Sequence, residues 1–405
     1  MKYLKSGIHS VQHIQSAGLH AGLKSDPAKK DLALLYFPDG ATVAGVFTRN
    51  LVKAWPVKHG QKALKNNDRY KAIIINSGNA NACNGISGQN ALETIIQQVA
   101  TTCQISPADV LVSSTGIIGA PLKTEPFIDH LPTLFQSLQT NSSQDAAEAI
   151  MTTDTVKKET AYELEIDGKA IKIGAMAKGA GMIHPNMGTM LAYLVMDVAC
   201  DQAVLQTLLQ KAVDQSFNSL TVDGDTSTND TVFLCTTGEH SIDLLNENNL
   251  AKLQSLITQV CQDLAQMIAR DGEGATKFIT VQVEQAANDE DALTIAKAIA
   301  TSNLFKTAAF GQDPNWGRII SAIGYSGVTT LDPDQIDIGF SSEYGQVKTC
   351  LNGAAIDFDL KLAQRILSAV DFTVEVNLKQ GAGCSTIWTC DLSHDYVEIN
   401  ADYHT

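Results

Sequence analysis

A glycine followed by a threonine, Gly188-Thr189, lies between a glycine-rich stretch that begins at Lys178 and an apolar run from Met190 to Val198. Gly188 has no side chain, so its carbonyl carbon is open to attack by the hydroxyl of Thr189. That attack would give an ester, and hydrolysis of the ester would release a new N-terminal threonine. The freed α-amine, with an ordinary pKa of about 7.7–8.0, can act as general base for its own hydroxyl. A glycine-rich turn that enters a core strand is the commoner explanation of these residues alone.

Other residues carry groups that suit acyl transfer. Ser114-Thr115-Gly116 follows a short apolar run and offers a hydroxyl and an accessible backbone amide, which can donate hydrogen bonds to an oxyanion. Glu273 is flanked by glycines, and its carboxylate can bind a substrate ammonium group. The polar C-terminal residues are typical of a fraying tail. Each pattern also occurs in ordinary turns, so none of them identifies a site alone.

Metal and nucleotide sites are not indicated. The stretch Asp223 to Asp230 resembles a calcium loop, but its glycine and closing glutamate are misplaced, which favours a turn. The histidines lack the paired spacing of metal ligands, and Gly179-Ala180-Gly181 lacks the third glycine of a dinucleotide fingerprint. We therefore expect no metal and no cofactor.

The elements that must position these residues follow from the apolar patterns. Strands and helices alternate without a regular repeat, which predicts a mixed α/β class. A change to polar composition near residues 286–290 suggests a domain boundary after residue 285. The expected strands cover residues 72–76, 110–112, 171–176, 190–198, 278–283 and 372–378, and the expected helices include 92–99, 145–151, 204–213, 250–268 and 293–299.

Composition narrows the class of protein. The chain has 405 residues, of which 44% are hydrophobic, and a formal net charge of -15. An acidic surface disfavours binding to nucleic acid or to anionic lipid. No apolar run reaches the ~18 residues of a membrane span, and the polar N-terminal residues lack an apolar signal core. The 8 cysteines are scattered without a CxxC pair, which is typical of reduced thiols, so we expect a cytoplasmic enzyme.

The segment from Lys178 to Leu191 closely resembles the self-cleavage segment of the ornithine acetyltransferase (glutamate N-acetyltransferase) family of arginine biosynthesis. Further matches follow in family order and span most of the chain. They are Asn76 to Gly85, Ser114 to Gly116, Met151 to Thr155, Asp223 to Asp230, Phe310 to Arg318 and Tyr396 to Thr405.

The resemblance implies roles for individual residues. Thr189 resembles the nucleophile exposed by cleavage after Gly188, which would divide the chain into an α part and a β part. The implied oxyanion hole is Thr115 with Gly116. The implied substrate-binding residues are Thr152 (with Thr153 as the alternative), Lys178, Thr189, Glu273, Asn400 and Thr405. Two residues depart from the family pattern: Gly188 stands where alanine is usual, and His184 where a small residue is common.

The resemblance also implies a fold and a reaction. The fold is a layered α/β sandwich of the N-terminal-nucleophile kind over residues 1–285, which contains the cleavage site. A smaller α+β domain over residues 286–405 follows, and its tail returns to the active site. The reaction passes acetyl from N-acetylornithine to L-glutamate by a ping-pong mechanism. The implied assembly is a heterotetramer of two α and two β parts.

Three alternatives stay open from the sequence. No residue decides whether acetyl-CoA is a second acetyl donor, as it is in some members of the family. An N-terminal-nucleophile aminopeptidase or amidase would share the cleavage chemistry. An uncleaved protein that only binds a small molecule would use the same pocket without any chain break.

Overall fold

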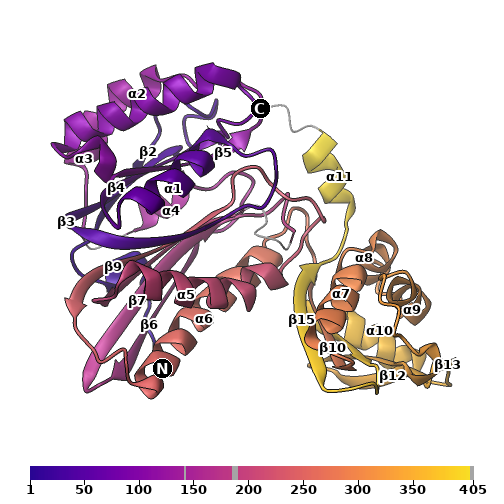
Figure 1. Cartoon of the computed structure of the whole chain (residues 1–405). Helices are drawn as coiled ribbons and strands as arrows, with labels where there is room; N and C mark the ends of the chain where they lie inside the picture. Colours follow the sequence, from indigo (N-terminus) through magenta and orange to yellow (C-terminus); the bar gives the residue numbers. More distant parts are fainter. Residues whose placement is uncertain (141–142, 185–189, 402–405) are drawn as a thin grey trace. The chain divides into compact units, whose positions relative to one another are not determined.

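The structure is a computed structural model that describes residues 1–140, 143–184 and 190–401. The described chain forms two compact units (Figure 1). Of the described residues, unit 1 contains Met1–Asn218 and Asp225–Ile268, and unit 2 contains Ser219–Gly224 and residues 269–401. Each unit combines helices with a sheet, which confirms the expected mixed α/β class.

The passage between the units lies earlier than the expected boundary at residues 285/286. Strand β10 (Phe278–Ala286) covers that position and lies inside the sheet of unit 2, between β14 (Asp371–Asn377) and β15 (Gly383–Cys390). The polar residues that suggested the boundary begin helix α7 (Asp289–Ala300) instead. The Asn288 side chain caps this helix by accepting a hydrogen bond from the Asp291 amide.

Unit 1 is built on a 9-stranded sheet with the order β1-β6-β7-β8-β9-β3-β4-β5, in which β2 also pairs with β3. Its strands are β1 (Lys2–Tyr3), β2 (Gln15–Leu19), β3 (Leu32–Phe47), β4 (Arg69–Asn79), β5 (Val110–Ile117), β6 (Lys158–Ile166), β7 (Lys169–Lys178), β8 (Leu191–Val198) and β9 (Thr231–His240). Its helices are α1 (Trp55–Asn66), α2 (Gly85–Cys103), α3 (Glu125–Gln136), α4 (Gln144–Ala149), α5 (Gln202–Asp214) and α6 (Glu247–Arg270), with short 3-10 turns η1 (Ile8–Ser10), η2 (Pro107–Asp109) and η3 (Phe217–Ser219).

Strand β3 joins the two halves of this sheet. Its first part, Leu32 to Tyr36, pairs with β2 and β4, and its last part, Thr42 to Phe47, pairs with β9. Its register with β4 shifts between Tyr36 and Ala41, and beyond this shift β9 takes the place of β2 on the other edge of the strand.

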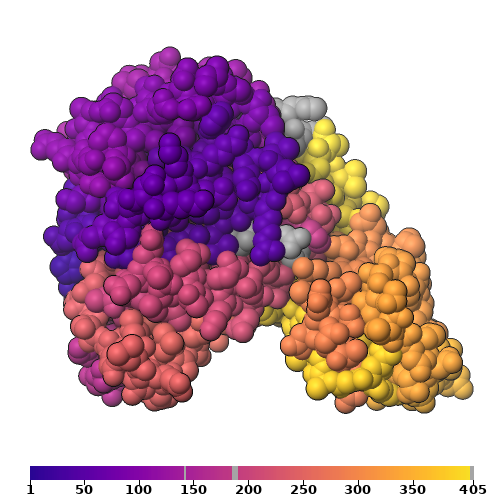
Figure 2. Space-filling model, in the orientation of Figure 1, coloured from indigo at the N-terminus to yellow at the C-terminus, as the bar shows by residue number. Residues whose placement is uncertain are grey.

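The two faces of β3 and β4 pack against different layers. Leu34 and Ile74 belong to a core cluster with α2 and α3, whereas Leu35 and Ile75 belong to a cluster with β8 and β9. The sheet therefore folds over on itself, which confirms the layered sandwich. Figure 1 shows α2 and α3 on one side of unit 1 and α5 and α6 on the other. In Figure 2 the indigo N-terminal segment and the magenta segment that follows β8 lie directly against each other.

Strand β8 is the central strand of this fold. All of its residues are buried, as expected for a run that is apolar almost throughout. It pairs antiparallel with β7 and parallel with β9. The expected cleavage site lies in the sequence just before β8.

Unit 2 is built on a 6-stranded sheet with the order β13-β12-β11-β14-β10-β15. The alternation expected over residues 372–378 is confirmed, because Phe372, Val374 and Val376 are buried in a core with the helices. Its further strands are β11 (Asp337–Ser342), β12 (Gly345–Leu351) and β13 (Ala354–Ala355), and its further helices are α8 (Asn303–Phe310), α9 (Trp316–Gly324), α10 (Leu360–Ser368) and α11 (His394–Ala401), with the 3-10 turn η4 (Pro333–Gln335). Among the described residues, no helix is long and apolar enough to cross a membrane.

Candidate active site

Thr115 and Gly116 lie at the end of β5, beside the end of β4. Ser77 pairs with Thr115 and Gly78 with Gly116 in a parallel register, so both strands extend beyond their expected ends. Gly116 has φ +129, and a Cβ built on it would lie 2.3 Å from the carbonyl carbon of Gly78. Only glycine fits this close approach. The turn therefore has a fixed backbone, which an oxyanion hole requires.

The Thr115 hydroxyl is available as a donor. Thr115 is 6% exposed, and its hydroxyl forms no hydrogen bond with the rest of the described chain. The neighbouring Ser114 hydroxyl donates instead to Asn76 Oδ1 at 2.6 Å. Thr115 thus differs from its neighbour in offering a donor that the fold does not already use.

Lys178 is buried at the end of β7, in a cluster of charged groups that the sequence did not reveal. The Asp154 carboxylate accepts a hydrogen bond from Lys158 Nζ at 2.7 Å and lies 4.0 Å from Lys178 Nζ. It also accepts the amide hydrogens of Gly179 (2.6 Å) and Thr152 (2.9 Å). Asp154 therefore ties together the chain at Thr152, β6 and the start of the glycine-rich stretch.

The electrostatics of this cluster favour an anion. Burial alone would raise the pKa of Asp154, but the positive charges of Lys178 and Lys158 outweigh it and lower the pKa to about 2. Lys24 is a third cation of the cluster: its pKa is lowered to about 8, mainly by burial and in smaller part by the charges of Lys29 and Lys178. Three lysines thus surround one strongly ionised carboxylate, an arrangement that suits the α-carboxylate of an amino acid.

The strand after the expected cleavage site is held by a buried acid. The Met190 amide donates to Asp230 Oδ1 at 3.0 Å, and Thr231 N donates to the Met190 carbonyl at 3.1 Å. Burial raises the pKa of Asp230 well above its ordinary value, despite the hydrogen bond from Met190. Gly188, Thr189 and Thr405 lie outside the described residues.

Two further expected residues lie in unit 2 and contact each other. Asn400 Nδ2 donates to Glu273 Oε2 at 2.8 Å, and Glu273 is only 9% exposed. The turn around Glu273 packs against the start of α11, where Ser393 Oγ donates to the Gly274 carbonyl at 2.6 Å. The structure thus pairs Glu273 with Asn400, and places Thr115, Gly116, Thr152 and Lys178 in unit 1.

Sequence reasoning missed the residues that support these groups. Asp154 lies in the matched segment from Met151 to Thr155, but the sequence assigns it no role. Lys24 and Lys158 lie in none of the matched segments. The sequence predicts only a turn for the run from Asp223 to Asp230. In the structure the Asn229 side chain also donates to the Ser114 carbonyl, and the Asp230 carboxyl accepts the Met190 amide hydrogen.

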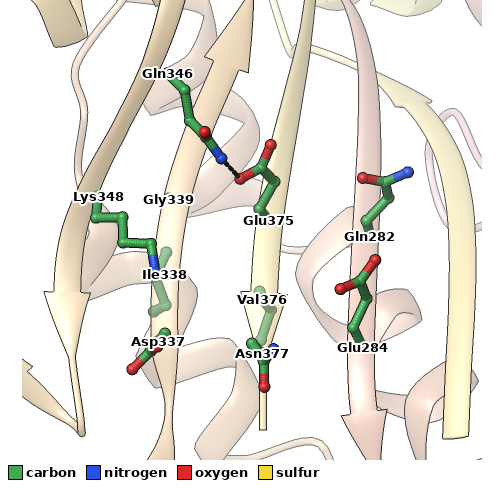
Figure 3. Close-up of a pocket in the computed structure, with 10 residues that line it drawn as sticks. All are labelled: Gln282, Glu284, Asp337, Ile338, Gly339, Gln346, Lys348, Glu375, Val376 and Asn377. Carbon is green, nitrogen blue, oxygen red and sulfur yellow. Dashed lines mark hydrogen bonds between the residues drawn. The ribbon is translucent and has the colours of Figure 1, made fainter. Parts of the chain in front are cut away.

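Other clusters and hollows do not coincide with these residues. Asp197, Glu239 and His240 approach within the reach of one metal ion, but the buried Asp197 already accepts a hydrogen bond from the Lys172 amide. In unit 2 a hollow of about 330 Å³ lies on the sheet face opposite the helices. Figure 3 shows that polar side chains line it, among them Glu375, which accepts a hydrogen bond from Gln346. None of the expected site residues lines this hollow.

Comparisons with known proteins cover nearly all of the chain. The family model described as the ArgJ family matches residues 15–405. A protein of Caldanaerobacter subterraneus named arginine biosynthesis bifunctional protein ArgJ is 42% identical over 407 residues, covering 100% of both chains. A protein of Clostridium acetobutylicum named arginine biosynthesis bifunctional protein ArgJ 1 is 41% identical over 98% of this chain and 97% of its own.

Two solved structures are also similar to this chain. The arginine biosynthesis bifunctional protein of Bacillus halodurans is 40% identical, with a TM-score of 0.48, and covers 53% of this chain and 99% of its own. An ornithine acetyltransferase of Mycobacterium tuberculosis, solved in complex with ornithine, is 34% identical, with a TM-score of 0.42, and covers 47% of this chain and 98% of its own.

Proposed function

Since the chain belongs to the ArgJ family, we propose that it is an acetyltransferase of arginine biosynthesis that cleaves its own backbone between Gly188 and Thr189. Thr189 then carries acetyl from N-acetylornithine to L-glutamate. The observation that carries this proposal is the 42% identity to a protein of that name over the full length of both chains. Such a match includes the expected cleavage segment, the oxyanion turn and the tail.

The proposed reaction has two acyl-transfer steps. The α-amine of Thr189 takes the proton of its own hydroxyl as the oxygen attacks the acetyl carbonyl of N-acetylornithine. The tetrahedral intermediate collapses when that proton passes to the departing nitrogen, which releases ornithine and leaves an acetyl ester on Thr189. The amine of L-glutamate then attacks the ester carbonyl, which gives N-acetylglutamate and restores the hydroxyl.

The Thr115 hydroxyl and the Gly116 amide donate to the oxyanion in both steps of this scheme. Support for this assignment is the fixed backbone of the turn and the unused hydroxyl of Thr115. A preorganised donor contributes most when it does not have to reorganise during the reaction.

Substrate binding is assigned by charge. Lys178, beside Thr152, binds the α-carboxylate that both substrates carry, and the surrounding excess of lysines supports this choice. Glu273, held by Asn400, binds a cationic group, and by family resemblance Thr405 in the tail also contacts the substrate. The relatives are named bifunctional, which favours acetyl-CoA as a second donor. By the same resemblance the enzyme is a cytoplasmic heterotetramer of two α and two β parts.

The test uses Thr189→Ala. The variant should run as one 43.3 kDa chain without acetyl transfer from N-acetylornithine to glutamate. The wild type should give two fragments, the second beginning Thr-Met-Leu. An active wild type that stays uncut would refute the scheme. Hydrolysis of peptide amides without acetyl transfer would instead favour the aminopeptidase alternative, and glutamate acetylation from acetyl-CoA alone tests the second donor.

A further inference from the structure

We propose that Asn229 and Asp230 are positioning residues that together align the oxyanion turn with the nucleophile. Asn229 holds the peptide that precedes Thr115, and Asp230 holds the peptide that follows Thr189. The inference rests on the proposed function, because it assigns these two residues to the same site.

Asn229 fixes the oxyanion turn through its side-chain amide. Its Nδ2 donates to the carbonyls of Ser114 (2.8 Å) and Ala80 (2.6 Å), and its Oδ1 accepts from the Thr228 hydroxyl at 2.6 Å. The Ser114 carbonyl belongs to the planar peptide whose nitrogen is that of Thr115. Holding this carbonyl therefore limits rotation of the chain as it enters the Thr115-Gly116 turn.

Asp230 acts on the other partner of the reaction. It is 1% exposed, and its Oδ1 accepts the Met190 amide hydrogen at 3.0 Å. That hydrogen belongs to the peptide bond between Thr189 and Met190, and a planar peptide bond also contains the α-carbon of the preceding residue. The hydrogen bond therefore fixes the amide nitrogen of Met190, the residue that directly follows the proposed nucleophile in the sequence.

The backbone of Asp230 is itself anchored. Its carbonyl accepts a hydrogen bond from the Thr48 amide at 3.0 Å, just beyond the end of β3. Asn229 and Asp230 directly precede β9. Their side chains bond to two different parts of the site, Asn229 to Ser114 in β5 and Asp230 to Met190 at the start of β8.

A purely structural role explains Asp230 poorly. Its second oxygen, Oδ2, is buried and meets no partner at hydrogen-bond geometry among the described residues, although the nearby Thr48 hydroxyl lowers the pKa of the carboxyl. Burial raises the pKa of Asp230 well above its ordinary value. Asparagine is the closest mimic, because it has nearly the same shape and keeps the Oδ1 acceptor for the Met190 amide.

The chain offers a matched control near the far end of β8. Asp197, near the other end of β8, is also buried and also accepts a backbone amide hydrogen, from Lys172 at 3.0 Å. Burial raises its pKa to about 6. Replacing Asp197 should therefore perturb the fold in a similar way without touching the candidate active site.

The experiment compares Asp230→Ala, Asp230→Asn, Asn229→Ala and Asp197→Ala as full chains. It measures the rate of self-cleavage of freshly synthesised chain, kcat and KM for both substrates, and the thermal midpoint. We expect Asp230→Ala to slow cleavage and lower kcat by about 10²-fold, the loss that a misplaced reacting group can cause. Asn229→Ala should lower kcat by ~10–10² with KM little changed. Asp230→Asn and Asp197→Ala should stay within roughly threefold of wild type on the same scale.

Two results would overturn the inference. One is an Asp230→Ala chain that cleaves and turns over as fast as Asp197→Ala. The other is an Asp230→Asn chain as impaired as Asp230→Ala, which would point to proton transfer by the carboxyl instead. If Asp230→Ala does not fold, Asp230→Leu removes the acceptor at similar size. An uncut and inactive wild type would refute the proposed function and the positioning role together, whereas failure of the variants alone concerns only the inference.

Discussion

Replacing Asp154 by asparagine should destabilise unit 1 by about 3–5 kcal/mol, because it removes the carboxylate charge that pairs with the buried Lys158. The side chains of Asp154 and Lys158 are both 0% exposed and meet at 2.7 Å. Lys178 lies 4.0 Å from the same carboxylate. The neutral amide would retain some hydrogen bonding but would not balance either ammonium group.

The lowered pKa of Asp154 gives a second figure for part of this loss in the free energy of unfolding. Its pKa falls from 3.8 to about 2, which corresponds to about 2 kcal/mol of stability in favour of the ionised form. Because the folded pKa is depressed, this contribution is complete above about pH 4 and is lost as the pH falls toward about 2. The stability difference between Asp154→Asn and its parent should therefore narrow below pH 4.

The assay is urea unfolding in a Thr189→Ala background, so that every variant is a single chain. Replacing Trp316 and Trp388 by phenylalanine leaves Trp55, in α1, as the fluorescent probe of unit 1. Glu148→Gln is the matched control. Its carboxylate also pairs with lysines but is 40% exposed, so the expected loss is below about 1 kcal/mol.

A second variant separates the loss of the Asp154–Lys158 ion pair from the cost of burying the Lys158 charge. Adding Lys158→Met to Asp154→Asn should recover part of the stability, because the buried ammonium is removed with its partner. A loss below about 1 kcal/mol for Asp154→Asn, or no recovery in the double variant, would show that solvent or another group balances Lys158 and would refute the reasoning.

Three further predictions concern activity. Thr115→Val should lower kcat for acetyl transfer by ~10²–10³ with an unchanged thermal midpoint, and a turnover within threefold of wild type would exclude its hydroxyl as an oxyanion donor. Lys178→Met should raise KM for both N-acetylornithine and glutamate more than it lowers kcat; unchanged KM values would place the α-carboxylate elsewhere. Deleting Asn400 to Thr405 should lower activity while gels still show self-cleavage, and unchanged kinetics would remove the tail from substrate binding.

The sequence predicted those elements whose signal is local. The sequence of β8 is continuously apolar because both of its faces are buried. The sequence of β14 alternates because only one of its faces is buried. Strand β4 ran longer than its apolar core indicated. Ser77 and Gly78 form ladder pairs with β5, and the Asn- and Gly-rich sequence does not reveal this pairing.

Supporting groups of the candidate site could not be predicted because their partners are distant in sequence. Asn229 is 115 positions from Ser114 and 149 from Ala80, its two hydrogen-bond partners. Similarly, nothing near Lys158 in the sequence distinguishes it from the exposed Lys157 beside it. Only the fold shows that one lysine is buried against Asp154 and the other pairs with Glu148 at the surface.

The strand order of unit 1 has a consequence for the life of the mature enzyme. β8 and β9, which follow the Gly188–Thr189 bond, sit between β7 and β3, which precede it. A cut at that bond would leave two polypeptides that are hydrogen-bonded to each other at two places in the sheet, where β7 pairs with β8 and where β9 pairs with β3. The proposed cleavage would keep both pieces in place if the sheet forms before the cut. Once heated apart, the two pieces would have to find each other in solution, so the uncut Thr189→Ala chain should renature at dilutions where the processed enzyme does not.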